Sequence, residues 1–452
     1  MNTESAITNP GTDTVPQSSD LRPGTEIGSL WTARRLYIAV FLFFNLFINY
    51  MDRTALSMAG PVIANHFKWR PGTMGLLFSS FMWSYSLCLI PWGAMSDRIG
   101  TKRVSSISVT LWSVAAMLTS MSVGFRSMLS TRLALGIGES ASLPMAAKAV
   151  RQWFPASERG LATAIFNTGT FAGPAIAAPF VAWLILNTGW RMSFVITGGI
   201  GLIWVALWLK FFDLPSHCSW LSCAERDYLA SKINETAPSG KSVRATLLDL
   251  LGRRTMWGLC LTQGCCAYMM SMFLFWLPSY LTAARNMSLM KASWFTSVPY
   301  LVASALGIYI GRLSDAVLTS DSARYGKRRS MLMILMILSM AVLLINGADN
   351  ELIVLFLISI ALTCISGALS LNIALANDLV WNSEIAGTAL GILILGGISF
   401  SLLAPIVTGY IVQVTGSFSG AFFLAGLLLL AGVIASFTMT RKPLSFTAPQ
   451  VA

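Results

Sequence analysis

Charged side chains are scarce in this sequence. Of its 452 residues, 11% are Asp, Glu, Lys or Arg, whereas 55% are hydrophobic, and the mean hydropathy is +0.67. A water-soluble domain of this length carries about twice that share of charge, so a soluble fold is excluded. Apolar runs of about 20 residues predict membrane-spanning helices, and the chain contains many of them.

Histidine is almost absent. The two histidines, His66 and His217, lie near or beyond the edges of the apolar runs, which disfavours a histidine proton relay. The sequence shows no His-rich cluster, glycine-rich phosphate loop or Ser–His pair, so a membrane enzyme is disfavoured as well. Among the seven cysteines, Cys218 and Cys223 lie beside His217 but match no standard zinc spacing. We therefore expect neither a cofactor nor a metal.

The basic residues do not form a patch for nucleic acid, although the net charge is +12. They lie mainly in short loops between apolar runs. If the N-terminus is cytoplasmic, 23 of the 31 Lys and Arg residues fall on the cytoplasmic side, when those at the inner ends of spans are included. Six fall on the opposite side, and two, Arg53 and Arg132, lie in the interior of spans. This is the positive-inside pattern, which predicts that both termini are cytoplasmic. The expected partners are the lipid bilayer, protons and a small substrate.

The apolar runs predict twelve spans in two sets of six. They cover about 36–64, 73–95, 104–123, 127–150, 160–187, 192–212, 256–284, 292–314, 330–347, 352–377, 386–414 and 419–440. The expected domains are a disordered tail at 1–32 without a cleavable signal peptide, a first bundle at 33–212, a cytoplasmic linker at 213–254, a second bundle at 255–440 and a tail at 441–452. Within the linker, residues 222–229 predict a short amphipathic helix on the inner face.

The two sets of spans resemble each other. The Ser-Glu pair at 157–158 recurs at 383–384, and Pro179 recurs as Pro405 at the same offset of 226 residues. Two related six-helix halves, with a substrate between them near the middle of the membrane, are typical of secondary transporters. One chain then contains a complete transport path, so we expect the monomer to function.

Four charged residues lie inside apolar runs. Asp52 and Arg53 occupy the first span, and Arg132 and Glu139 the fourth. Arg132 and Glu139 are two helical turns apart, so they share one face at a separation of about 10 Å. Such charges cost several kcal/mol at membrane depth unless they are paired or hydrated, so they predict a functional site. The alternative is that they only lock helices together.

The loop after the second span resembles the loop signature of the major facilitator superfamily. It reads Gly93-Ala94-Met95-Ser96-Asp97-Arg98-Ile99-Gly100-Thr101-Lys102-Arg103, and a related segment begins at Gly311. The resemblance implies an all-α integral membrane protein, with twelve transmembrane helices in two pseudo-symmetric six-helix bundles. The residues expected to form a gate are Gly93, Asp97, Arg98 and Asp315. Asp97 can cap a helix N-terminus of the other half and so hold the inner gate closed.

Within that superfamily the chain is similar to the anion:cation symporters, which include bacterial galactonate, glucarate, hexuronate and phthalate transporters. The similarity rests on three segments, namely Asn49-Tyr50-Met51-Asp52-Arg53, residues 132–139 with Pro144, and Trp276-Leu277-Pro278-Ser279-Tyr280-Leu281. It implies a protein of the bacterial inner membrane that imports a small organic carboxylate, such as a sugar acid, by proton symport through alternating access.

The resemblance also implies residue roles. Asp52 and Glu139 are expected to carry protons, Arg53 to link protonation to the substrate, and Arg132 to anchor its carboxylate. Tyr50 and Tyr85 match cavity tyrosines of the sugar-acid members, or pack as aromatics. Physical chemistry agrees, because arginine stays charged and can bind a carboxylate through two parallel hydrogen bonds. Protonation of an acid would release its arginine for the substrate, so proton and anion would bind cooperatively.

Two departures disfavour a sugar acid. Thr170 and Ile394 stand where sugar-acid members carry amides. Gln263, Ser370, Asn372 and Asn377 could replace those amides, or they could form hydrogen bonds between helices.

The nature of the acid and of the coupling therefore stays open. Tyr268, Met269, Met270 and Phe273 could form a wall for an aromatic acid of the phthalate type, or simply pack. An exchanger, a sodium-coupled carrier and a non-transporting sensor are the remaining alternatives. Sodium is disfavoured because Asp52 lies beside Arg53 rather than in a cluster of oxygen ligands.

Overall fold

The structure is a computed structural model that describes residues 34–218, 220–232, 243–317, 326–380 and 383–441. The predicted tails fall outside these residues, apart from Arg441. The helices of the first half are α1 (Leu36–Phe67), α2 (Pro71–Ile99), α3 (Thr101–Thr119), α4 (Phe125–Glu139), α5 (Ser142–Trp153) and α6 (Arg159–Phe211). The linker contains α7 (Cys223–Lys232) and α8 (Val243–Gly252). The second half contains α9 (Arg254–Ala283), α10 (Leu289–Val317), α12 (Lys327–Ser339), the 3-10 helix η2 (Met340–Gly347), α13 (Glu351–Leu379), α14 (Ser383–Thr415) and α15 (Ser419–Met439).

The predicted all-α membrane fold is confirmed. Eight of the described helices are long and apolar enough to cross a membrane. Helix α6 contains spans five and six, which are separated at Gly189, where φ is 83° and ψ is 161°. Only glycine adopts such a backbone conformation readily, so Gly189 allows the chain to turn back within one helical run. Span four is divided into α4 and α5, and span nine continues from α12 into η2.

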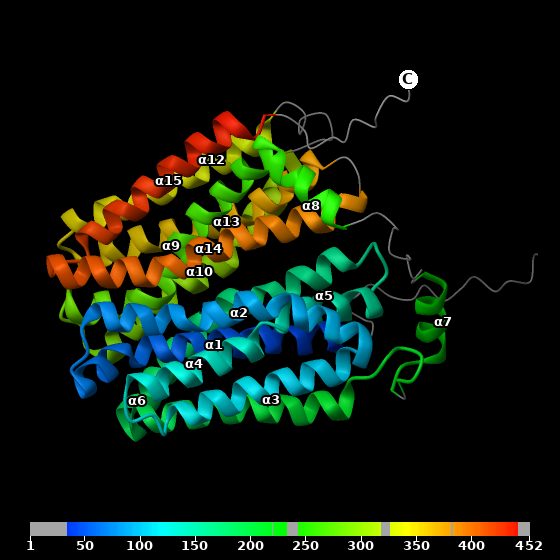
Figure 1. Cartoon of the computed structure of the whole chain (residues 1–452), viewed down its shortest axis with the longest axis horizontal. Coiled ribbons are helices and arrows are strands. Elements are labelled where there is room, and N and C mark those ends of the chain that lie inside the picture. Colours follow the sequence, from blue (N-terminus) through cyan, green and yellow to red (C-terminus); the bar gives the residue numbers. More distant parts are fainter. Residues whose placement is uncertain (1–33, 219, 233–242, 318–325, 381–382, 442–452) are drawn as a thin grey trace, which may run out of the picture.

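The most extensive contacts between the two halves in the described structure are those of α2 with α14, α6 with α10, and α1 with α9. Figure 1 shows the halves as two bundles, with the first half in blue to green below the second half. The ribbons lie against each other at the left and separate towards α5 and α8 at the right. We call the end that carries α7 and α8 the linker end, and the opposite end the closed end.

Small residues and aromatic rings bring the halves together at the closed end. A Cβ atom at Gly75 would lie 2.4 Å from the carbonyl oxygen of Pro405, so only glycine fits there. The backbone N–H of Gly72 donates a hydrogen bond of 3.0 Å to Oε1 of Gln413. Deeper in the molecule, the ring of Phe78 stacks on Phe275 at 5.6 Å. These contacts fix α2 against α9 and α14 from the closed end towards the middle of the molecule.

Hydroxyl groups add hydrogen bonds across the same interface. Ser79 Oγ donates to the carbonyl oxygen of Leu402 at 2.7 Å. Ser57 Oγ donates to the carbonyl oxygen of Phe275 at 3.0 Å. Such bonds are worth about 0.5–1.5 kcal/mol each, so the contacts of the closed end can form and break without large loss of stability.

Helix α7 is fixed to the first half by a buried charge cluster. Arg35 is fully buried and forms ion pairs of 2.6 Å with Glu158 and 2.9 Å with Glu225, the latter on α7. Burial alone would lower the pKa of Arg35, but the two carboxylates raise it above its ordinary value. Nearby, Trp153 stacks on Trp220 with ring centroids 5.5 Å apart. The first part of the linker is therefore attached to the first half.

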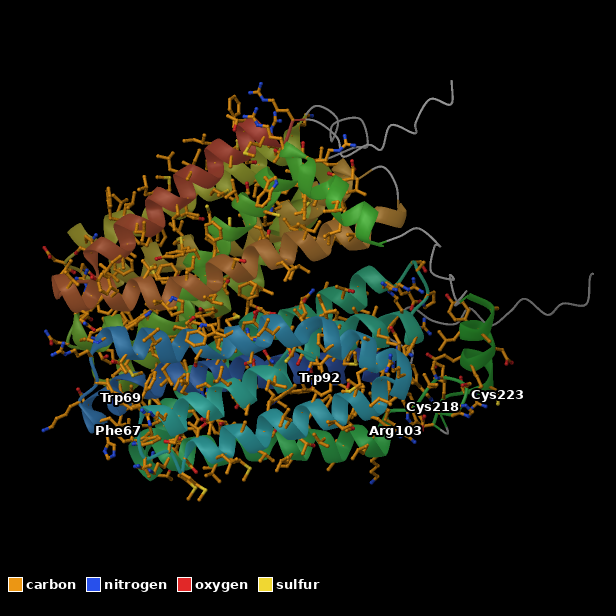
Figure 2. The ribbon with its side chains drawn as sticks, in the orientation of Figure 1. Phe67, Trp69, Trp92, Arg103, Cys218 and Cys223 are labelled. Carbon is orange, nitrogen blue, oxygen red and sulfur yellow. The ribbon has the colours of Figure 1, made fainter. Side chains whose placement is uncertain are left out.

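Figure 2 labels side chains at both ends of the molecule. Phe67 and Trp69 stack at 4.7 Å at the closed end. Cys218 and Cys223, the first residue of α7, lie at the linker end. Of these two cysteines Cys218 is buried and Cys223 is exposed. No group of three or more His, Cys, Asp or Glu residues that could hold a metal ion occurs in the described part of the chain.

Candidate functional site

Arg53 and Glu139 form a buried ion pair between α1 and α4. Nε of Arg53 donates a hydrogen bond of 2.9 Å to Oε2 of Glu139. Arg53 is 7% exposed and Glu139 is fully buried. Both residues belong to the predicted site, and the structure brings them into direct contact from different helices.

Three aromatic rings surround the guanidinium group of Arg53. Its central carbon lies 4.6 Å from the ring centroid of Tyr50, 4.8 Å from Phe81 and 5.4 Å from Tyr85. Cation–π contacts of this kind stabilise a desolvated arginine by about 2 kcal/mol. The predicted tyrosines Tyr50 and Tyr85 therefore line the same site as the ion pair.

The ion pair leaves hydrogen-bonding capacity unused. Only Nε of the Arg53 fork bonds to Glu139, and Oε1 of Glu139 is buried without a hydrogen-bond partner among the described residues. A guanidinium group has five N–H donors. Arg53 can therefore bind a second carboxylate through its remaining donors.

Asp52 of α1 and Arg132 of α4 are the other two predicted charged residues. Asp52 is 2% exposed, and neither carboxylate oxygen has a hydrogen-bond partner in the described structure. It interacts electrostatically with Glu139, Arg132 and Arg53. Nη2 of Arg132 donates to the hydroxyl of Thr119 at 2.8 Å. All four predicted charged residues therefore belong to one coupled group inside the first half.

The position of Arg132 bears on its predicted role. Its guanidinium carbon lies 5.5 Å from the ring of Phe194 on α6, and its hydrogen bond goes to α3. The contacts described for Arg132 and for Arg53 are all with helices of the first half. The Phe81 ring that contacts Arg53 lies 5.8 Å from the ring of Phe275 on α9, however, so Arg53 lies next to the interface between the halves and is the better placed of the two to meet a substrate there.

The polar residues of the second half bond mainly to one another. Nδ2 of Asn372 donates to Oε1 of Gln263 at 2.9 Å and to the carbonyl oxygen of Leu259 at 3.0 Å. Ser370 is exposed, and its hydroxyl donates to the carbonyl oxygen of Ser366 within α13. Gln263 and Asn372 thus join α9 to α13, as the packing alternative predicts.

The gate residues show no contact with the second half in the described structure. Asp97 is exposed and forms an ion pair of 2.7 Å with Lys148 on α5 of its own half. Arg98 is exposed as well, and a Cβ atom at Gly93 would have no atom within 4 Å. The side chain of Asp315 lies outside the described residues. The gate at the linker end stays a prediction for a conformation in which that end closes.

Tyr300 on α10 is a buried polar residue of the second half near this site. It is fully buried, and its hydroxyl has no hydrogen-bond partner among the described residues. It interacts electrostatically with Tyr50. The only signal in the sequence is a tyrosine in the middle of an apolar span, which does not distinguish it from a packing residue.

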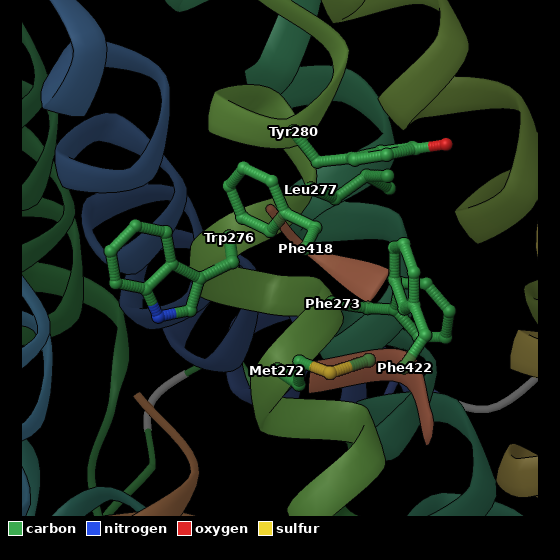
Figure 3. A pocket seen from close by; sticks show the side chains of 7 residues that line it. All are labelled: Met272, Phe273, Trp276, Leu277, Tyr280, Phe418 and Phe422. Carbon is green, nitrogen blue, oxygen red and sulfur yellow. The ribbon is translucent and has the colours of Figure 1, made fainter. Parts of the chain in front are cut away.

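An apolar pocket lies apart from this site, between α9 and α15 (Figure 3). Its lining residues are Met272, Phe273, Trp276, Leu277, Tyr280, Phe418 and Phe422. The ring of Phe273 faces Phe422 at 6.5 Å, so it packs within the second half. No charged side chain lines this pocket, so it is unsuited to an anion. The predicted aromatic wall therefore does not include Phe273.

The sequence matches the Major Facilitator Superfamily over residues 42–319 and 292–451. The chain belongs to this superfamily. It is 32% identical over 418 residues to a probable galactarate/D-glucarate transporter of Escherichia coli (strain K12), covering 89% of this chain and 92% of the relative. It is 30% identical over 403 residues to a probable sulfoacetate transporter of Cupriavidus necator, covering 86% and 90%.

A solved structure has the same fold. A bacterial homolog of the human lysosomal transporter Spinster, in an inward-facing and unoccupied conformation, superimposes with a TM-score of 0.73 and 18% identity. The match covers 92% of this chain and all of that chain. The predicted superfamily and fold are confirmed, and the protein is a multi-pass membrane transporter rather than an enzyme.

Proposed function

We propose that this protein imports a small organic acid together with protons, by alternating access between its two halves. The observation that carries the proposal is the buried pair of Arg53 and Glu139, with Asp52 and Arg132 close by. The two similar relatives are named as transporters of acids, one of galactarate or glucarate and the other of sulfoacetate. A site built around arginine suits the acidic group that these compounds share.

Charge balance explains why protons would accompany the substrate. The two acids and two arginines of the site sum to zero charge when all are ionised. An anion that enters this buried site adds negative charge, which is costly away from water. Protonation of Glu139 or Asp52 removes that charge, and protonation of Glu139 also releases Arg53 for the substrate. Proton and anion then strengthen each other's binding, as symport requires.

The substrate is an acid with few hydroxyl groups. Thr170 and Ile394 offer no amide, and the amides of Gln263 and Asn372 already bond to each other. A sugar acid is the alternative, because one relative is named for galactarate and glucarate. An aromatic acid of the phthalate type and exchange of organic anions also remain compatible with the fold.

The asymmetry of charge indicates the orientation. Most Lys and Arg residues outside the spans lie on the side of the linker and the termini, so the linker end faces the cytoplasm. The protein then resides in the bacterial inner membrane, with the gate residues Asp97 and Arg98 exposed on the cytoplasmic side. The closed end faces outward, and import requires that it open.

The test is transport into liposomes that contain only this purified protein and an internal pH dye. Glucarate, galactonate, glucuronate, sulfoacetate, phthalate and benzoate are added one at a time. We expect at least one acid to acidify the lumen, and empty liposomes and the Arg53→Ala variant to give no response. Uptake of a labelled acid without proton movement would replace symport by exchange or uniport. Absence of uptake for every acid would contradict the proposal.

A further inference from the structure

The hydroxyl of Tyr300 is a buried polar group with no structural bond to explain it. The side chain is fully buried, and its hydroxyl has no hydrogen-bond partner among the described residues. A buried hydroxyl that stays unpaired costs about 1–3 kcal/mol, and buried tyrosines usually find a partner. A phenylalanine would fill the same space without that cost, so packing alone does not account for the hydroxyl.

Tyr300 lies on a helix that packs against the first half near the arginine site. Tyr300 interacts electrostatically with Tyr50, and the Tyr50 ring lies 4.6 Å from the guanidinium carbon of Arg53. A Cβ atom at Gly173 of α6 would lie 2.8 Å from Cβ of Tyr50, so α6 packs tightly behind Tyr50. Helix α6 packs against both Tyr50 and α10, which brings Tyr300 close to Tyr50 and Arg53.

The helix that carries Tyr300 is fixed to the first half at this level. Ser297, one turn earlier on α10, donates a hydrogen bond to the carbonyl oxygen of Ala175 on α6. Tyr300 nevertheless belongs to the second half and Arg53 to the first. A molecule that contacts both residues would bind between the halves.

We propose that Tyr300 determines substrate specificity by donating a hydrogen bond to a second polar group of an acid whose carboxylate is bound by Arg53. This inference rests on the proposed function. The hydrogen bond from Tyr300 favours acids with two polar groups, such as dicarboxylates, sulfonated carboxylates or hydroxy acids. An acid with one carboxylate and an apolar remainder makes no use of the hydroxyl.

Tyr300→Phe removes only the hydroxyl, and Tyr268→Phe is its matched control. Tyr268 is also buried with an unpaired hydroxyl, but it lies on α9 near Thr408 within the second half. Binding to the purified protein is measured by calorimetry for succinate and for butyrate, which differ in one polar group. We expect Tyr300→Phe to raise the dissociation constant of succinate about tenfold, which corresponds to about 1.4 kcal/mol, and to leave the dissociation constant of butyrate unchanged. Tyr268→Phe should change neither.

Thermal unfolding of the substrate-free protein separates this role from a structural one. Removing an unpaired hydroxyl should leave the melting temperature of Tyr300→Phe unchanged or higher, whereas loss of a bond that holds the halves together would lower it. The inference would be overturned if Tyr300→Phe lost the same affinity for both acids, or if it lost no affinity for succinate. A lowered melting temperature of the variant would also overturn it. If the wild-type protein transports acids but Tyr300→Phe keeps its selectivity, only this inference fails. If the wild-type protein binds and transports no acid, the proposed function fails with it.

Discussion

Nε of Arg53 lies 2.9 Å from Oε2 of Glu139, in a hydrogen-bonded ion pair that joins α1 to α4. The second oxygen of Glu139 has no hydrogen-bond partner among the described residues, and Tyr50, Phe81 and Tyr85 surround the guanidinium group. A single proton on Glu139 would therefore cancel the charge that holds Arg53. The pair has the geometry of a switch between proton binding and anion binding.

The first prediction concerns the role of Glu139 in coupling. Glu139→Gln keeps the hydrogen bond to Arg53 but can no longer gain or lose a proton. We expect the variant to exchange internal for external substrate while losing at least tenfold in accumulation driven by a pH gradient, measured with labelled acid in liposomes. Glu225→Gln is the control, because Glu225 also pairs with an arginine, Arg35, but far from the site at α7. Accumulation by Glu139→Gln at the wild-type level would exclude Glu139 as the coupling acid.

The second prediction separates the two arginines. Arg132 interacts electrostatically with Asp52 inside the first half, so Arg132→Ala removes a cation that offsets the charge of this buried carboxylate. An uncompensated buried charge is strongly destabilising, so the melting temperature should fall even without substrate. Adding Asp52→Asn to the Arg132→Ala variant should restore part of the lost melting temperature, because the uncompensated charge of Asp52 is then removed.

Arg53→Lys serves as the comparison for this prediction. Lysine keeps the charge next to Glu139 but not the planar fork that binds a carboxylate through two bonds. We expect it to weaken acid binding about tenfold or more while lowering the melting temperature less than Arg132→Ala. The division of roles would be refuted if Arg53→Lys lowered the melting temperature more than Arg132→Ala and weakened acid binding less.

The sequence predicts the membrane fold and the members of the site, because both leave a local pattern. Charged residues inside apolar runs identify Asp52, Arg53, Arg132 and Glu139 without any knowledge of tertiary contacts. The pairing among them is not local. Arg132 and Glu139 share a face of α4 by their spacing, yet Glu139 bonds to Arg53 of α1. That choice depends on the rotation of α1 against α4, which periodicity within one helix does not determine.

Other features of the structure have even weaker signals in the sequence. Tyr300 gains its significance only because α10 packs against α6 and brings it to Tyr50. The predicted roles of Gln263 and Asn372 were ambiguous for the same reason, since a polar residue within an apolar span can face a substrate or another helix. Their mutual hydrogen bond of 2.9 Å favours packing.

The third prediction concerns the closed end. A side chain at position 75 would collide with the backbone of Pro405, so Gly75→Val should disfavour the conformation described here and favour opening at this end. Ser79 is fully buried under the same contact, and the rate at which maleimide labels Ser79→Cys should rise in the presence of Gly75→Val. Gly93→Val on the same helix is the control, because a side chain there meets no atom within 4 Å. Equal labelling rates in the two backgrounds would contradict a role for this interface in gating.

The fourth prediction concerns the attachment of α7. Cys218 is 1% exposed, and burial raises the pKa of its thiol. Because the thiolate is the reactive form, maleimide at pH 7 should label the exposed Cys223 first and Cys218 slowly. Arg35→Ala leaves Glu158 and Glu225 facing each other without their shared cation, so α7 should detach and Cys218 should react about tenfold faster.

The control for this labelling experiment is Lys102→Ala, which removes a partly exposed ion pair with Asp213 at the same end of the molecule. Exposed pairs contribute about 0–1 kcal/mol, so the reactivity of Cys218 should stay within twofold of the wild type. Mass spectrometry of the peptides that carry Cys218 and Cys223 gives both rates in one sample. If the wild-type protein were labelled equally fast at both cysteines, α7 would not be held by Arg35. A slow Cys218 that becomes fast only with Arg35→Ala would show that this arginine joins the linker to the first half, so that α7 moves with that half during transport.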